Sequence, residues 1–237
     1  MPTGLTFRST RPAPGAARAY RLPMEAGEDR KLVVLVSGNG SNLQAILDAC
    51  AAGRLPATRV VLVVSNRADA FGLERAAHAG VATAVVAAHR GEPRAEYDAR
   101  LAAVVGAAAP DVVVLAGFMR LLTMAFLGPM AAAGAMVVNL HPALPGELPG
   151  THAIERAYEE SRAGTRPATG VMVHLVPDEG VDDGPVLATR TVPIHAGDTL
   201  DSLAERVHAT EHELLVATLA TLATPATLDP ATLEARA

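Results

Sequence analysis

The feature that most constrains the fold is an alternation of short, β-branched apolar runs with longer segments rich in alanine and leucine, beginning at Lys31. Strands that alternate with helical patterns predict βαβ units and a mainly parallel sheet. Several runs are apolar without interruption, which is typical of strands covered by helices on both faces. The expected fold class is therefore α/β, a three-layer, doubly wound, mainly parallel sheet. The predicted strands are 32–36, 60–65, 83–86, 112–116, 136–140, 170–176 and 185–192, and the predicted helices are 42–52, 71–79, 94–108, 125–133, 152–161 and 200–222.

The chain is expected to form one domain with short extensions. Its 237 residues, of which 50% are hydrophobic and 19% charged, are enough to bury one sizeable core. We expect a domain over 31–224, a loosely ordered extension over 1–30 and a tail over 225–237. The extension has no apolar stretch long enough for a signal-peptide core. Its arginine-rich composition also resembles a transit peptide, although Pro12 and Pro14 interrupt an amphipathic helix.

Charge and cysteine content limit the partners of the chain. A net charge of -5 with acids and bases interspersed leaves no basic stripe, so nucleic acid is not an expected partner. The single cysteine, Cys50, cannot form an internal disulfide or a cysteine cluster for a metal, and it fits a reducing cytoplasm. No run of about 18 apolar residues occurs, so no membrane span is expected. These features favour a cytoplasmic protein that acts on small molecules, as a monomer or a homodimer.

A glycine-rich turn, Ser37-Gly-Asn-Gly-Ser-Asn42, joins the first predicted strand to the first helix. The free backbone N–H groups and the positive dipole end of that helix converge on the turn, which is a suitable place for an anion. Gly40 allows close backbone approach, while Ser41 and Asn42 offer hydrogen bonds to phosphate oxygens. A capped helix after a glycine turn without any ligand has the same appearance, and the residues alone leave both interpretations open.

A dinucleotide fits this turn poorly. Leu43 stands where the third glycine of the dinucleotide-binding fingerprint belongs. The next predicted strand ends in Ser65-Asn-Arg67, without an acidic residue to hold an adenosine ribose. Arg67 would tolerate a 2′-phosphate, so a nicotinamide enzyme stays an alternative, but a terminal monophosphate fits better.

Two polar side chains leave the fifth predicted strand on the same side. Asn139 and His141 alternate with Leu140, so an amide and an imidazole lie together at the strand end. Such a pair can stabilise an oxyanion that develops at a carbonyl group. One carboxylate of a later acidic loop could orient His141 and raise its pKa. The candidates are Asp178, Glu179, Asp182 and Asp183, and the residues alone do not show which one, nor do they exclude a merely solvated loop.

One carboxylate falls on the apolar face of the last predicted helix. Glu211 lies four residues after Val207 and four before Leu215, within an apolar stripe with helical spacing. A carboxylate there is costly unless it is paired or faces a cleft. Glu211 therefore binds a ligand hydroxyl or amine, has a partner such as Arg206 or His212, or simply interrupts the stripe.

Six blocks of this sequence, in this order, resemble phosphoribosylglycinamide formyltransferase, of the formyl transferase family. The resemblance covers roughly 31–224 and implies a Rossmann-like formyltransferase fold with an antiparallel strand near its C-terminal part. It implies a phosphate-binding half up to about residue 135 and a catalytic, folate-binding half after it. The blocks are VLVSGNGSNLQAI, SNRADAFGLERA, APDVVVLAGFMRLL, NLHPALPG, DEGVDDGPV and RVHATEH.

The resemblance also implies a reaction and the residues for it. The formyl group of 10-formyltetrahydrofolate, a co-substrate, would pass to the amine of glycinamide ribonucleotide in purine biosynthesis, and no metal would be required. His141 would be the proton donor, Asn139 would help to stabilise the oxyanion, and Asp182 would keep His141 charged. The implied glycinamide ribonucleotide site consists of Gly40, Ser41, Asn42, His208, Ala209, Thr210 and Glu211. The implied folate site consists of Arg94, Met119, Arg120, Leu121, Leu122, Asn139, Asp178, Glu179, Gly180, Val181 and Asp182.

The sequence departs from the family pattern at two places, and rival functions stay open. Pro145 and Gly146 look displaced in the loop over 143–149, and Val171 and Met172 stand where small hydroxyl residues are usual. The nearest rivals are a formyltetrahydrofolate hydrolase and a formyltransferase for a tRNA-bound amine or an aminosugar, neither of which needs a phosphate loop. A nicotinamide-dependent oxidoreductase and a noncatalytic phosphate-sensing module are more distant alternatives.

Overall fold

The structure is a computed structural model that describes residues 29–222, so the tail predicted over 225–237 and nearly all of the extension predicted over 1–30 lie outside the described residues. Arg30, assigned to the extension by sequence, is instead the first residue of the first strand. The elements are β1 Arg30–Val36, α1 Ser41–Ala51, β2 Thr58–Ser65, α2 Phe71–His78, β3 Ala82–Val85, α3 Arg94–Ala107, β4 Val112–Leu115, α4 Met124–Ala132, β5 Met136–His141, α5 Ala153–Arg162, β6 Ala168–Leu175, β7 Val186–Pro193 and α6 Leu200–Leu222.

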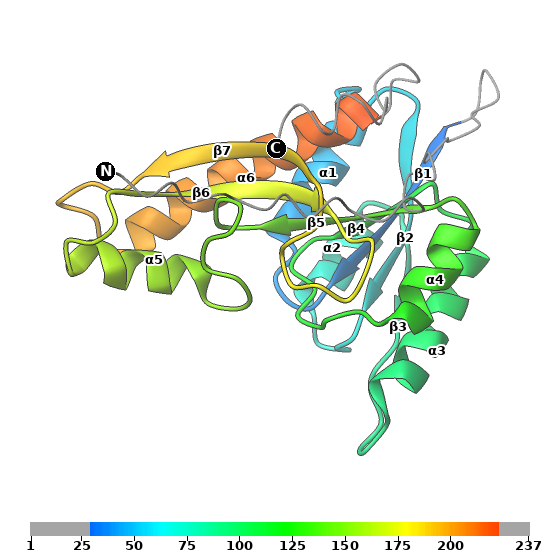
Figure 1. The fold of residues 1–237 in the computed structure, drawn as a ribbon. Helices are drawn as coiled ribbons and strands as arrows, with labels where there is room; N and C mark the ends of the chain where they lie inside the picture. Colours follow the sequence, from blue (N-terminus) through cyan, green and yellow to red (C-terminus); the bar gives the residue numbers. More distant parts are fainter. Residues whose placement is uncertain (1–28, 223–237) are drawn as a thin grey trace, which may run out of the picture.

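The strands form one seven-stranded sheet in the order β3-β2-β1-β4-β5-β6-β7 (Figure 1). Strands β1 to β5 pair in parallel, as βαβ units require. Strand β6 pairs antiparallel with β5, and β7 pairs antiparallel with β6. Strand β6 is therefore the one strand of the described sheet that runs against the others, which confirms the predicted fold class. It starts at Ala168, two residues before the prediction, because Ala168 and Thr169 extend the ladder with β7.

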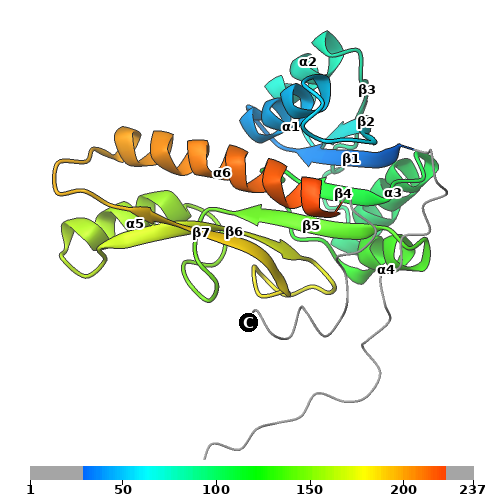
Figure 2. The same ribbon diagram turned by 90° about the horizontal axis from the view of Figure 1, so that it is seen from above.

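Helices cover both faces of the sheet and bury two hydrophobic cores, as Figure 2 shows from above. Helices α1, α2 and α6 contribute to the core on one face, and α3 and α4 contribute to the core on the other. Strand β1 contributes side chains to both cores because successive residues point to opposite faces of the sheet. Leu32, Val34 and Val36 face the first core, while Val33 and Leu35 face the second. All five side chains are completely buried. This explains why the run is apolar without interruption.

The chain changes direction across the sheet between β1 and β4, which are neighbours in space but not in sequence. Ligands of open α/β sheets bind outside the carboxyl ends of strands at such a switch point. Here the two strand ends are joined by Ser37: its N–H donates to the Gly117 carbonyl at 3.1 Å, and its hydroxyl oxygen accepts the Met119 N–H at 2.8 Å. The loop after β1 and the loop after β4 therefore form one rigid edge.

The helices expected from the sequence are all present, with ends shifted by no more than one or two residues. Helix α6 has the predicted bounds. Helix α5 starts one residue later than predicted, because His152 has a left-handed backbone with φ of 59° and lies outside the helix. Within residues 29–222, no helix is long and apolar enough to cross a membrane.

The buried position of β1 predicts a large cost for truncating its side chains. Leu32→Ala should lower the free energy of unfolding by about 2–5 kcal/mol, because a completely buried leucine leaves a cavity. Val85→Ala, on the edge strand β3 and 46% exposed, should lower it by about 0.5 kcal/mol or less. Urea unfolding followed by circular dichroism measures both, and equal losses for the two variants would contradict this assignment of the core.

Candidate active site

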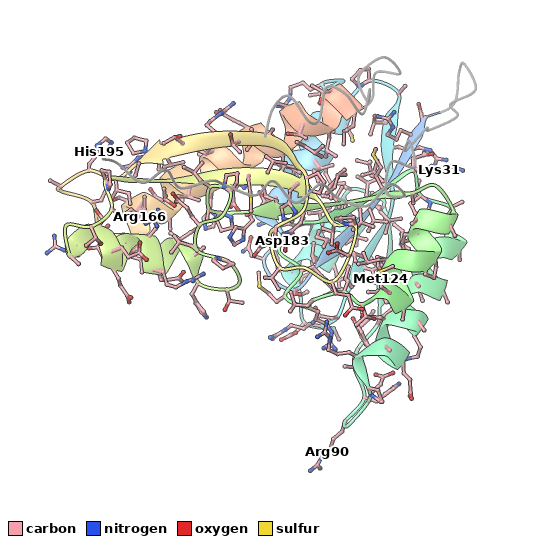
Figure 3. All side chains as sticks on the ribbon, in the orientation of Figure 1. Lys31, Arg90, Met124, Arg166, Asp183 and His195 are labelled. Atoms are coloured by element: carbon pink, nitrogen blue, oxygen red, sulfur yellow. The ribbon has the colours of Figure 1, made fainter. Side chains whose placement is uncertain are left out.

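A pocket of about 230 Å³ lies at the carboxyl ends of β4 and β5, between the loop after β4 and the loop that joins β6 to β7. Figure 3 labels Asp183 and Met124, which mark the β6–β7 loop and the start of α4 on either side of this region. Apolar side chains make up much of its wall, and polar groups gather at the end of β5. Most residues of the implied folate site line it, namely Met119, Arg120, Leu121, Leu122, Asn139, Asp178, Gly180, Val181 and Asp182.

Two residues of the implied folate site do not line the pocket but support its walls. Arg94 donates a hydrogen bond to the Leu121 carbonyl at 3.2 Å and so holds the loop after β4. The Glu179 carboxylate accepts the Met124 N–H at 2.9 Å, at the amino end of α4, where a negative charge is favourable. The two contacts fix the positions of the loops that enclose the pocket.

Asp182 is the carboxylate that meets the strand-end pair. Its Oδ1 accepts a hydrogen bond from Asn139 Nδ2 at 3.0 Å, and its Oδ2 accepts the Gly150 N–H at 2.8 Å. The same Oδ2 lies 3.3 Å from His141 Nδ1. Of the four acidic candidates in the loop, the structure places this one beside His141. The carboxylate thus joins β5, the loop after β5 and the β6–β7 loop.

The backbone of Asp182 is strained, and its carboxyl group is ionised. Its φ of 55° lies in the left-handed region, which non-glycine residues rarely adopt. Burial raises the pKa of Asp182, but His174, whose Nε2 lies 3.6 Å from Oδ1, the Gly150 N–H and the nearby His141 lower it by more, so the net pKa lies below the ordinary value. A negative charge, on a side chain only 11% exposed, is therefore maintained at the centre of the polar cluster.

His141 is held between two acceptors. It is only 4% exposed, and its Nε2 lies 3.0 Å from the Leu148 carbonyl oxygen while Nδ1 faces Asp182. Burial lowers the pKa of His141, whereas the Asp182 charge and the Leu148 carbonyl raise it, and burial prevails. The acidic loop does provide a carboxylate that raises the pKa of His141, as the sequence predicted, but burial has the larger effect, and the sequence does not reveal how deeply this ring is buried. The implied role of Asp182, to keep His141 charged, is opposed by this desolvation.

His174 is a site residue that sequence reasoning missed. It is 2% exposed on β6, directly opposite Asn139 in the antiparallel register. Its Nδ1 lies 2.8 Å from the Leu175 carbonyl oxygen, which requires a proton on Nδ1, and its Nε2 lies 3.1 Å from Asn139 Nδ2. His174 therefore orients the Asn139 amide together with Asp182. Its signal in the sequence was a lone polar residue inside the apolar run over 170–176.

The glycine-rich turn lies at the amino end of α1, next to the pocket edge. Gly40 has φ of 73°, and a side-chain carbon there would lie 2.7 Å from the Gly72 Cα, so only glycine fits. No side chain caps α1, which leaves the N–H groups of its first turn without partners inside the helix. The Oδ1 atom of Asn42 is also buried without a partner among the described residues. The Asn42 oxygen is an acceptor, so the backbone N–H groups are the unused donors of this turn that can bind an anion.

The implied substrate residues on α6 form a second polar group. Glu211 is 5% exposed, as its place on the apolar stripe predicted, and its partner is His208 rather than Arg206 or His212, with Nδ1 2.7 Å from the carboxylate Oε2. The hydrogen bond and the charge of Glu211 raise the pKa of His208. Thr210 donates its hydroxyl hydrogen to the Arg206 carbonyl, and Ala209 is exposed. Because α6 packs against α1, Glu211 and the turn belong to the same face of the sheet.

The structure also accounts for the two departures from the family pattern. The unusual loop is held by Arg156, which donates to the carbonyls of Leu148 and Pro149, each at 2.7 Å. Val171 and Met172 are almost completely buried in β6 and pack in the interior instead of offering hydroxyl groups. Within residues 29–222, no group of three or more histidine, cysteine, aspartate or glutamate side chains is placed to hold a metal ion.

The chain is similar to known proteins over most of its length. A family model described as formyl transferase matches residues 30–219. Phosphoribosylglycinamide formyltransferase from Escherichia coli (strain K12) is 46% identical over 183 residues, which cover 77% of this chain and 82% of that protein. The chain belongs to this formyl transferase family. The Schizosaccharomyces pombe protein of the same name is 45% identical to this formyltransferase over 193 residues, covering 78% of this chain and 93% of its own length.

Solved structures agree with the family assignment of this formyltransferase. Glycinamide ribonucleotide transformylase 1 from Geobacillus kaustophilus superposes with a TM-score of 0.75 at 39% identity, covering 83% of this chain and 100% of that one. Phosphoribosylglycinamide formyltransferase from Bacillus halodurans gives 0.74 at 34% identity and covers 81% and 95% of the two chains. The similarity thus extends over nearly the whole described domain.

The contacts of Asp182 predict a shift in the titration of His141. Asp182→Asn removes a negative charge that raises the pKa of His141, so this pKa should fall further below its ordinary value. Titration of the imidazole resonances by NMR measures the change. Asp183→Asn, which removes the neighbouring exposed carboxylate, is the matched control and should leave the His141 titration in place. An unchanged pKa in Asp182→Asn would show that Asp182 does not act on this ring.

Proposed function

We propose that this chain transfers the formyl group of 10-formyltetrahydrofolate to the amine of glycinamide ribonucleotide, giving formylglycinamide ribonucleotide and tetrahydrofolate, a step of purine biosynthesis. The observation that carries the proposal is the Asn139, His141 and Asp182 cluster at the end of a pocket whose edge is tied to a phosphate-type turn. Membership of the family supports the same reaction.

The acceptor binds along α1 and α6 in this proposal. The unpaired N–H groups of the first turn of α1, with Gly40, Ser41 and Asn42, receive the ribose 5′-phosphate, because a helix amino end favours negative charge. Glu211 accepts hydrogen bonds from the ribose hydroxyls, with His208 holding its carboxylate in place. A phosphate at the turn directs the other end of the acceptor towards the carboxyl ends of β4 and β5.

The formyl donor occupies the pocket. Backbone groups of the loop over 119–122 and of the loop over 178–182 provide polar contacts for a flat heterocycle, while Leu115, Phe118 and Leu122 supply apolar wall. Arg94 and Glu179 support these loops rather than the ligand itself. The formyl group then lies near the end of β5, where Asn139 and His141 meet Asp182.

The chemistry follows from the polar cluster. The neutral amine of the acceptor forms a bond to the formyl carbon, negative charge develops on the formyl oxygen, and the bond from carbon to the folate nitrogen breaks. Asn139 and His141 stabilise that charge: the two Asn139 N–H groups bond to His174 and Asp182 in the free protein, and one of them turns to the formyl oxygen. Preorganised donors in a site shielded from water are worth more than the same donors in solution.

The lowered pKa of His141 suits this residue to carry a proton from the amine to the departing folate nitrogen. The amine loses one proton and the departing folate nitrogen gains one, so a group that is neutral at rest and protonated in passing can carry it. Burial favours the neutral His141 ring at rest. Asp182 and the negative charge that grows on the formyl oxygen then favour the protonated ring. His141 is the proton carrier in this proposal, and Asp182 is the group that stabilises its charged form.

An acceptor test decides between this function and its closest rivals. The protein mixed with 10-formyltetrahydrofolate should release tetrahydrofolate only when glycinamide ribonucleotide is present, because the phosphate turn selects that acceptor. The absorbance change on loss of the formyl group follows the reaction. Equal turnover without the acceptor would identify a hydrolase and overturn the proposal. Turnover with an aminosugar or an aminoacylated tRNA, but not with glycinamide ribonucleotide, would overturn it as well.

Replacement of the proton carrier should affect the rate and not the binding. His141→Ala should lower kcat by a factor of about 10²–10⁴ while the KM of each substrate changes little, because proton transfer is lost and the binding groups remain. His195→Ala, which removes an exposed histidine before α6, is the matched control and should keep the rate of the unaltered protein. Near-normal turnover in His141→Ala would remove this residue from the mechanism.

A further inference from the structure

Arg75, on α2, holds the turn that the proposed function assigns to the acceptor phosphate. Its Nε donates to the Asn39 carbonyl at 2.9 Å, and its Nη2 donates to the Asn39 side-chain Oδ1 at 3.0 Å. Its Nη1 donates to Gln44 Oε1 on α1 at 3.2 Å. One guanidinium thus connects three elements: α2, the glycine-rich turn and the first helix.

The amino end of α2 touches the turn at a second place. The Gly72 N–H donates to the Gly38 carbonyl at 3.0 Å, and the Gly72 Cα lies so close to Gly40 that no side chain fits between them. The Arg75 guanidinium also stacks over the Phe71 ring, with its central carbon 4.8 Å from the ring centroid. Arg75 is therefore anchored on its own helix while it binds the turn.

The charge of Arg75 is not neutralised by a carboxylate. Its three hydrogen bonds go to neutral amide acceptors, and among the ion pairs of residues 29–222 none includes Arg75. The chain's arginines at 67, 100, 166, 190 and 206 are, in contrast, all paired with acids. A positive charge without an acidic partner next to a helix amino end adds to the attraction for an anion.

We propose that Arg75 is a positioning residue for acceptor binding: by its fork of hydrogen bonds to Asn39 and Gln44 it keeps the turn in the conformation that presents the α1 N–H groups to a phosphate. This inference rests on the proposed function for the nature of the ligand. It adds a residue outside the turn, and on a different helix, to the determinants of affinity for the phosphorylated substrate.

Arg75 takes no part in the folate pocket or in the polar cluster at the end of β5. It lies outside the residues that line the folate pocket, and it contacts none of Asn139, His141 and Asp182. A loss of Arg75 should therefore act on the acceptor alone, since the formyl donor and the proton carrier keep their surroundings. Separate effects on the two substrates distinguish a positioning role from a general loss of structure.

Steady-state kinetics and calorimetry with Arg75→Met test the proposal. Methionine keeps an unbranched stem over Phe71 and loses the three donors and the charge. The KM for glycinamide ribonucleotide should rise about tenfold or more, as the loss of charge-assisted hydrogen bonds implies, while kcat at saturation and the KM for the formyl donor stay within about twofold. Arg75→Lys, which keeps the charge but not the fork, should restore part of the affinity.

Matched controls separate charge, fold and function. Arg54→Met removes an exposed arginine after the other end of α1 and should leave both KM values unchanged. Binding of ribose 5-phosphate, measured by calorimetry without any folate, is independent of turnover and should weaken in Arg75→Met. If the unaltered protein binds this probe but uses another acceptor, the proposed function fails while the role of Arg75 is still measured.

Three outcomes would overturn the role of Arg75. The first is equal affinity of Arg75→Met and the unaltered protein for ribose 5-phosphate, with an unchanged KM for the acceptor. The second is an equal rise of KM for both substrates, which marks a general structural effect. The third is no binding of ribose 5-phosphate by the unaltered protein, which removes the anion site itself.

Discussion

The rest of the structure depends on strand β1, which is buried on both faces and paired in parallel on both edges. Its side chains alternate between the two cores, so it cannot shift by one residue without exchanging them. Its pairing with β2 and β4 fixes the point where the chain leaves the sheet. Ser37 then binds the loop after β4 directly. The phosphate-type turn and the folate pocket are consequently positioned by one strand.

The polar cluster at the end of β5 is organised around the negative charge of Asp182, which is largely shielded from water and stabilised by hydrogen bonds. Asp182 accepts hydrogen bonds from Asn139 and the Gly150 N–H and lies beside the His141 ring, and each of these partners comes from an element with its own packing. A buried carboxylate is unfavourable without such partners. The cluster therefore requires the correct arrangement of β5, β6 and both loops before it is stable, which links the completion of the fold to the formation of the site.

The sequence predicted the fold well where the pattern was local. The uninterrupted run of β1 and the spaced stripe of α6 each specify an element by its own residues, and Glu211 on that stripe is indeed buried. The residues that depend on contacts between distant segments were harder to find. Without a family resemblance, nothing in the acidic loop distinguished Asp182 from Asp183, because a left-handed backbone decides which carboxylate points inward.

Three further features could not be predicted from the sequence, because they also depend on contacts between distant segments. His174 reaches the site through a cross-strand register, and Arg75 reaches the turn through the packing of α2. The pKa of His141 depends on how deeply the ring is buried, and burial proved stronger than the neighbouring charge. Residue types suggest which side chains can pair, but the loss of solvation that shifts a pKa depends on the folded structure.

The left-handed backbone at Asp182 has a consequence for how this protein can be stabilised. Glycine would adopt φ of 55° without strain, so a search for a more rigid or heat-resistant protein would favour glycine at this position. That gain would remove the carboxylate on which the polar cluster depends. At this position the protein therefore retains a strained backbone, which costs stability, in order to keep the carboxylate that the polar cluster requires.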